Sequence, residues 1–130
     1  MASIIKKIPI QARPEAVWSA LRDLYNIHNR LARGFVTDTR QDGKDRIVTF
    51  ANGLVVRERI ISLDDAARRI AYSVGDGPLT HHSASFQVFA DGEAGTSLLW
   101  TTDLLPDEAE QDMRSMIEGG AEAIKRTLEG

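Results

Sequence analysis

The clearest pattern in the chain is an amphipathic stretch near its end, residues 107–128. Apolar residues recur there at the three- and four-residue spacing of a helix face, and most positions between them are charged. Pro106 precedes the stretch, acidic residues fill its first turn, and Lys125 and Arg126 lie near its end, as a helix dipole favours. The pattern predicts a helix roughly 33 Å long, which needs a broad apolar surface to pack against.

Shorter patterns in the preceding residues predict that surface. Residues 4–10 are rich in β-branched side chains and indicate a strand, and two short helical segments follow, one beginning at Pro14 and one at about residues 24–31. Six further strands, separated by turns, are predicted at residues 35–40, 46–50, 54–62, 69–74, 82–89 and 96–104. Because consecutive strands with short turns pair antiparallel, we expect an α+β fold with its helices gathered on one face of a curved sheet.

The turn after residue 50 decides which side chains of this hairpin face the long helix. A two-residue loop would mix apolar and charged side chains on both faces of the sheet. A three-residue loop that ends in a left-handed Gly53 pairs Val48 with Val56 and gathers the apolar residues on one face. We expect the second register because it buries a coherent apolar set, and it places Arg46 opposite Glu58 on the inner face.

The same period-two argument selects the inward-facing residues of the last three strands. They are Ile70, Tyr72 and Val74, then His82, Ala84, Phe86 and Val88, then Leu98, Trp100 and Thr102. Phe89 and Leu99 fall on the outer face. Because adjacent strand residues point to opposite faces, His81 and His82 cannot reach one site, which argues against a metal or catalytic histidine pair.

Composition narrows the classes of function. The 130 residues fit one domain, residues 1–130, and 42% hydrophobic residues can build an ordinary core. A net charge of −3 argues against nucleic acid as a partner, and the absence of cysteine excludes thiolate chemistry and disulfides. No signal peptide or membrane span is recognisable, so we expect a cytoplasmic protein without stable membrane insertion, and we expect no cofactor and no metal. The oligomeric state stays open, a homodimer included.

Glu58 and His82 are the main polar candidates on the inner face. A poorly hydrated Glu58 carboxyl would have a raised pKa and could act as a general acid or base, whereas an ion pair with Arg46 would make it structural. His82, as a neutral imidazole, could hydrogen-bond a ligand. His28 could join these two in one site, although nothing in the spacing requires it.

The order of these segments resembles that of a known group of proteins. The segments QARPEAVWSALRD, RIVTFANGLVVRERIISLDD and GTSLLWTTDL, in this order before a long helix, are similar to those of the START-like (SRPBCC) superfamily. Within it the polyketide cyclase/dehydrase-type group is most similar, a group related to Bet v 1-type proteins and abscisic-acid receptors. The resemblance implies the helix-grip fold, in which a seven-stranded antiparallel sheet wraps around the C-terminal helix and an apolar cavity lies between them.

The inward-facing residues and the resemblance together suggest a binding module. We expect it to hold a small, mostly hydrophobic ligand, such as a lipid, a polyketide-like molecule or an aromatic one, between the helix and the sheet. The expected ligand-binding residues are Phe50, Val56, Glu58, Tyr72, His82, Phe86, Trp100, Met113, Met116 and Ile117.

Two other classes of function compete with this reading. One is a polyketide cyclase, dehydratase or aromatase in which Glu58 or His82 transfers protons, so whether the protein is an enzyme stays open. The other is a protein-interaction module such as a chaperone cofactor, which would need an exposed apolar patch that the sequence does not clearly show.

Overall fold

The computed structural model describes residues 1–75, 77–93 and 95–130. The elements come in the expected order: a strand, two short helices, six strands and a long helix. Their bounds are β1 (Ala2–Ile10), α1 (Pro14–Arg22), α2 (Ile27–Arg30), β2 (Val36–Asp42), β3 (Asp45–Phe50), β4 (Val55–Asp64), β5 (Arg69–Gly75), β6 (His81–Asp91), β7 (Gly95–Leu105), the 3₁₀ helix η1 (Asp107–Ala109) and α3 (Glu110–Glu129).

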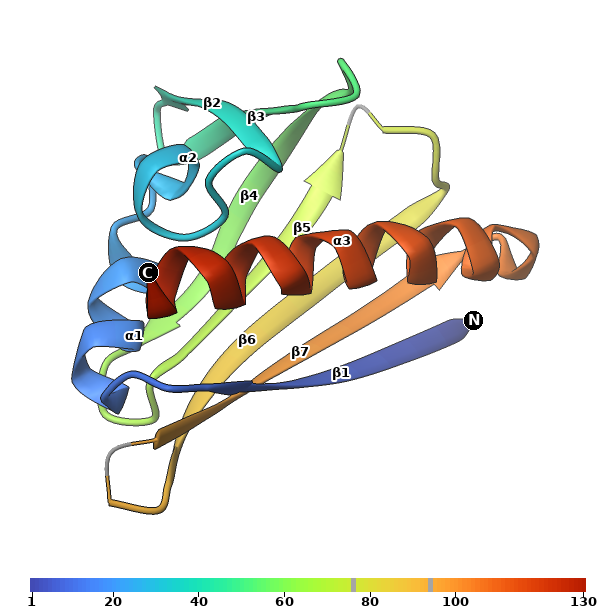
Figure 1. Cartoon of the computed structure of the whole chain (residues 1–130). Coiled ribbons are helices and arrows are strands. Elements are labelled where there is room, and N and C mark those ends of the chain that lie inside the picture. Colours follow the sequence, from blue (N-terminus) through green and yellow to red (C-terminus); the bar gives the residue numbers. More distant parts are fainter. Residues whose placement is uncertain (76, 94) are drawn as a thin grey trace.

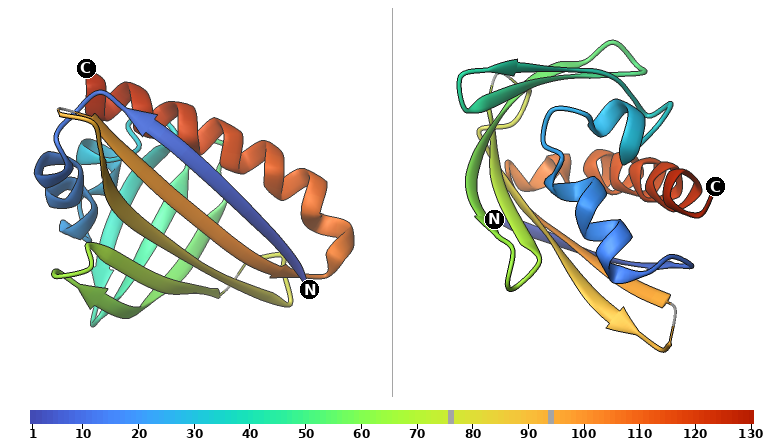
Figure 2. Two further views of the ribbon diagram at one scale, coloured as in Figure 1. Left: turned by 90° about the horizontal axis from the view of Figure 1, so that it is seen from below. Right: turned by 90° about the vertical axis from the view of Figure 1, so that its left-hand side faces the viewer.

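The strands form one antiparallel sheet in the order β1-β7-β6-β5-β4-β3-β2. The sheet curves around α3, which runs across its concave face (Figure 1). Helices α1 and α2 lie beside α3 within the curve of the sheet (Figure 2). This is the helix-grip architecture, so the fold expected from the sequence is confirmed.

Ion pairs and hydrogen bonds hold α3 along the edge strand β1. Lys6 Nζ lies 2.9 Å from Glu118 Oε1 in the middle of the helix. Nearer the C-terminal end, Lys125 Nζ donates to the carbonyl oxygen of Pro9 at 2.6 Å. These contacts join the helix to the edge strand, and the side chains on its apolar face point toward the concave surface.

The hairpin register predicted from the apolar pattern is confirmed. Val48 pairs with Val56 and Arg46 pairs with Glu58 across β3 and β4. Gly53 has a φ of 90°, the left-handed conformation that the three-residue loop requires. This register puts both members of the Arg46–Glu58 pair on the concave face, under α3.

The strands begin and end within two residues of the expected positions, and two helix boundaries differ more. Helix α2 is limited to Ile27–Arg30 because the chain turns before it, where the Asn26 N–H donates to the Asp23 carbonyl at 3.1 Å. The C-terminal helix begins with the 3₁₀ turn of η1, and α3 itself starts at Glu110. Neither difference moves a residue of the concave face.

Burial follows the predicted alternation along the strands. The inward residues of β5 to β7 are buried or half-buried, whereas Phe89 on the outer face is 44% exposed. The core forms two clusters. A large one joins α1, α2 and the second half of α3 to the sheet, and a small one joins β1, Leu104 and Ile117. Trp100 packs against both clusters.

Candidate functional site

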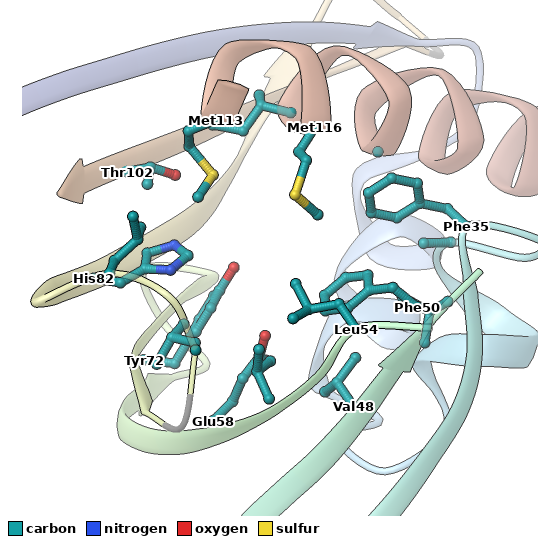
Figure 3. A pocket seen from close by; sticks show the side chains of 18 of the residues that line it. Phe35, Val48, Phe50, Leu54, Glu58, Tyr72, His82, Thr102, Met113 and Met116 are labelled. Carbon is teal, nitrogen blue, oxygen red and sulfur yellow. The ribbon is translucent and has the colours of Figure 1, made fainter. Parts of the chain in front are cut away.

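A cavity of about 300 Å³ lies between α3 and the concave face of the sheet. Its walls come from α2, the strands β2 to β7, η1, α3 and the loops between them. Figure 3 shows the side chains pointing into it, with Met113 and Met116 on the helix side and Val48, Phe50 and Leu54 on the opposite side. The cavity volume lies at the lower end of the range for small-molecule sites in proteins, which is about 300–1,000 Å³.

The ten side chains expected to bind a ligand all line this cavity: Phe50, Val56, Glu58, Tyr72, His82, Phe86, Trp100, Met113, Met116 and Ile117. His28, considered as a third member of a polar site, does not line it. The His28 Nδ1 atom lies 3.0 Å from the Thr39 hydroxyl on β2, and this contact holds the imidazole away from Glu58 and His82.

Aromatic rings cover much of the cavity wall. Tyr72 and Phe86 stack with ring centroids 6.3 Å apart, and Phe86 and Trp100 stack at 4.8 Å. The three residues come from the neighbouring strands β5, β6 and β7, so the rings form a continuous row across the sheet. Phe35 and Phe50 meet edge to face at 5.5 Å. These surfaces can hold flat or apolar parts of a ligand.

Arg46 and Glu58 form a buried ion pair at the sheet side of the cavity. Arg46 Nε lies 2.8 Å from Glu58 Oε1, and the two side chains are only 5% and 8% exposed. Arg46 Nη1 also donates to the Leu24 carbonyl at 3.0 Å, and the guanidinium lies 5.4 Å from the centre of the Tyr72 ring. The ion-pair interpretation of Glu58 is therefore confirmed, and both charged groups face the cavity.

Burial changes the proton affinity of two further groups in the cavity wall. Burial, with a smaller contribution from the Glu58 charge, raises the pKa of Tyr72, so its hydroxyl keeps its proton and can donate a hydrogen bond. Burial, with a smaller effect of His81, lowers the pKa of His82 to about 4, so its imidazole is neutral at neutral pH.

The indole nitrogen of Trp100 is buried and makes no hydrogen bond of normal geometry to any residue that the structure describes. Its N–H is nevertheless near enough to the Tyr72 hydroxyl to offset a small part of the rise in that pKa. The polar groups of Tyr72 and Trp100 thus lie together in the cavity wall, near the Arg46–Glu58 pair.

Phe35, just before β2, is one of the cavity residues that sequence reasoning missed. A Cβ atom added to Gly120 would lie 3.2 Å from the Phe35 ring and 3.0 Å from Trp100 Cη2. The glycine pair in the middle of the C-terminal helix was the available signal, because such glycines often allow a bulky neighbour to approach closely. The close approach of the Phe35 and Trp100 rings accounts for the glycine at position 120.

No cluster of three or more metal-binding side chains occurs among residues 1–75, 77–93 and 95–130. In the same part of the chain, no helix is both long enough and apolar enough to cross a membrane. The site is thus defined by its apolar walls, its aromatic row and one ion pair.

A curved antiparallel sheet closed by a long helix over an internal cavity defines the helix-grip class of proteins. Within this class, the chain belongs to the family described as polyketide cyclase/dehydrase and lipid transport, whose sequence profile matches residues 1–129. The resemblance to START-like proteins is thereby confirmed. No curated protein matches the chain.

Solved structures support the same fold at low sequence identity. The protein XoxI from Bacillus cereus is 20% identical with a TM-score of 0.87, and the match covers 98% of this chain and 96% of that one. An uncharacterised protein from Bacillus thuringiensis is 19% identical with a TM-score of 0.87, covering 98% of both chains. Norcoclaurine synthase from Thalictrum flavum, solved with a transition-state analogue, is 16% identical with a TM-score of 0.71, covering 98% of this chain and 93% of the enzyme.

Proposed function

We propose that this protein binds a small, mostly hydrophobic molecule in the cavity between α3 and the sheet. The observation that carries the proposal is the cavity itself, about 300 Å³ of space inside the fold with mostly apolar walls. A well-packed core closes gaps of this size, because unfilled space forfeits dispersion contacts and destabilises the folded state. The family's description, which names lipid transport and polyketide chemistry, agrees with such a ligand.

The aromatic row and the two methionines would supply most of the contact. Flat rings favour a planar or ring-containing ligand, and the flexible thioethers of Met113 and Met116 can adapt to its outline. Glu58, Tyr72 and His82 would orient the polar end of the ligand. The ten lining side chains that were expected from the sequence would all contact the ligand.

Native mass spectrometry of the freshly purified protein is the first experiment. A bound small molecule, identified after denaturing extraction, would support the proposal and give the ligand class. Uptake of the neutral fluorophore N-phenyl-1-naphthylamine is the second, because its emission rises when it enters an apolar cavity.

Filling the cavity provides the matched test of location. Met116 points into the cavity (Figure 3), so Met116→Trp is expected to weaken fluorophore binding by about tenfold or more. Ser115, its exposed neighbour on α3, gives the control variant Ser115→Trp, which should bind as the wild type does. Equal binding by both variants would place the binding site elsewhere and overturn the proposal.

A second candidate function is catalysis by a cyclase or dehydratase in the same cavity. The observation favouring it is that Glu58 and the neutral His82 line one cavity, where a bound substrate could exchange protons with either (Figure 3). With a linear poly-β-ketone thioester as substrate, His82→Gln and Glu58→Gln should each lower the cyclisation rate at least tenfold while the substrate still binds. Full activity in both variants would rule out these residues as proton carriers.

A further inference from the structure

We propose that the cavity selects against ligands with an anionic group, and that the Arg46–Glu58 pair sets this selectivity. The inference rests on the ligand binding proposed above and adds the electrical character of the ligand. It follows from how the charged groups of the cavity are already occupied.

The positive charge of Arg46 already has a partner within the protein. Its Nε contacts Glu58 at 2.8 Å, its Nη1 contacts the Leu24 carbonyl at 3.0 Å, and its Cζ lies over the Tyr72 ring, 5.4 Å from the ring centre. The positive charge is therefore compensated inside the protein by a carboxylate that is itself almost fully buried. A carboxylate, sulfonate or phosphate entering the cavity would have to compete with Glu58 for the same guanidinium.

Among the described residues that line the cavity, no second group adds a positive charge. His82 is neutral at neutral pH for the reasons given above. Asp112, exposed on the first turn of α3, contributes a second carboxylate to the lining. Among the lining residues that the structure describes, two carboxylates thus face a single guanidinium. An anion brought into this space loses its hydration without gaining a counter-charge, which is strongly unfavourable.

An uncharged polar group meets none of these penalties. The Tyr72 hydroxyl, on a side chain that is only 6% exposed, points into the cavity and makes no hydrogen bond of normal geometry within the described part of the chain (Figure 3). It can donate to a ketone, ester or ether oxygen of a ligand. The second carboxylate oxygen of Glu58 can accept from a ligand hydroxyl or amine while Oε1 stays with Arg46.

Two fluorophores of the same skeleton test the selectivity. N-phenyl-1-naphthylamine is neutral, and 8-anilinonaphthalene-1-sulfonate is the same molecule with a permanently charged sulfonate. The measured quantity, for each variant at neutral pH, is the dissociation constant of the sulfonate divided by that of the neutral probe. A high ratio means a preference for the neutral probe. The neutral probe is also more apolar, so a wild-type preference alone proves little, and the change in the ratio between variants is the decisive result.

Removing one charge at a time should move the ratio in different directions. Glu58→Gln leaves Arg46 without its counter-charge, and the sulfonate can then replace it, so the preference for the neutral probe should shrink about tenfold or more. Arg46→Gln leaves no cation, so the preference should stay at the wild-type level or increase. Glu122→Gln removes a charge from the exposed face of α3 and is expected to leave the ratio unchanged.

The outcomes separate this inference from the proposed function. Binding of neither probe to the wild type would overturn the proposed function and this inference with it. If the neutral probe binds but Glu58→Gln leaves the ratio unchanged, the selectivity alone is overturned. The same holds if Arg46→Gln lowers the ratio as much as Glu58→Gln does. If only one of the two variants folds, the direction in which it changes the ratio still tests the selectivity.

Discussion

At the scale of single residues, the two neighbouring glycines of α3 have different surroundings. A Cβ atom at Gly119 would lie 3.5 Å from the Phe35 ring, an ordinary contact distance. A Cβ atom at Gly120 would lie 3.0 Å from Trp100 and 3.2 Å from Phe35, which is closer than such atoms normally approach. Gly120 therefore allows α3 to lie against the aromatic wall of the cavity, and Gly119 has no comparable steric requirement.

Alanine substitution should therefore have opposite effects at these two positions. Gly119→Ala should stabilise the protein by about 0.5–1 kcal/mol, because alanine favours the helix over glycine. Gly120→Ala should destabilise it by about 1 kcal/mol, because the cost of crowding Trp100 and Phe35 exceeds the same helix gain. Urea unfolding of both variants measures this difference. A stabilising Gly120→Ala would show that the rings move aside freely.

His82 should make the stability of the protein depend on pH. Its pKa in the folded protein is about 4, below the ordinary value of 6.5, so the unfolded chain binds the proton more readily between these values. The contribution of His82 is then complete above pH 6.5 and is lost as the pH falls toward 4. After allowance for partial exposure to solvent, we expect a loss of about 1 kcal/mol from this residue between neutral pH and pH 5.

Denaturation curves at the two pH values measure this contribution. His82→Gln should lose less stability on acidification than the wild type does. The control His81→Gln, at an exposed position, should keep most of the wild-type pH dependence, because burial is the larger cause of the lowered pKa of His82. An identical pH dependence in His82→Gln and the wild type would contradict the assignment.

At the scale of elements, the hairpin of β3 and β4 depends on one backbone conformation. Gly53 has a φ of 90°, and the Phe50 N–H donates to the Leu54 carbonyl at 2.9 Å across the loop. Gly53→Ala should destabilise the protein by about 1–2 kcal/mol, because a side chain strains the left-handed conformation. Gly75→Ala, with an ordinary φ and open space around the added atom, is the control and should be nearly neutral. Equal stability of the two variants in urea unfolding would refute this explanation of the turn.

The elements also show what could be predicted from the sequence. Period-two patterning found the inner faces of β3 to β7, because a strand that is buried on one face must alternate. It also predicted the Arg46–Glu58 pairing, because the register follows from the same pattern. The extent of α2 was missed because a turn before Ile27 sets it. Phe35 was missed because its place in the cavity wall depends on α3, which lies far away in the sequence.

At the scale of the whole molecule, the ion pair raises a question about stability. A buried ion pair loses the hydration of both charges, and its replacement by apolar residues of similar size is often neutral or stabilising. The side chains of Arg46 and Glu58 are 5% and 8% exposed, so this reasoning applies to them. If the fold does not need the pair, its place in the cavity wall points to the ligand.

A double-mutant cycle tests whether the fold needs the pair. Arg46→Met and Glu58→Leu alone should each destabilise the protein by about 3–5 kcal/mol, because each leaves an unpaired charge in the interior. The free energy of unfolding of the double variant should lie within about 1–2 kcal/mol of the wild-type value. The remaining loss reflects the Leu24 carbonyl, which no longer has its donor. Urea unfolding provides the four free energies. Additive losses would show that each residue supports the fold independently, whereas strong coupling in a stable double variant would leave ligand selectivity as the role of the pair.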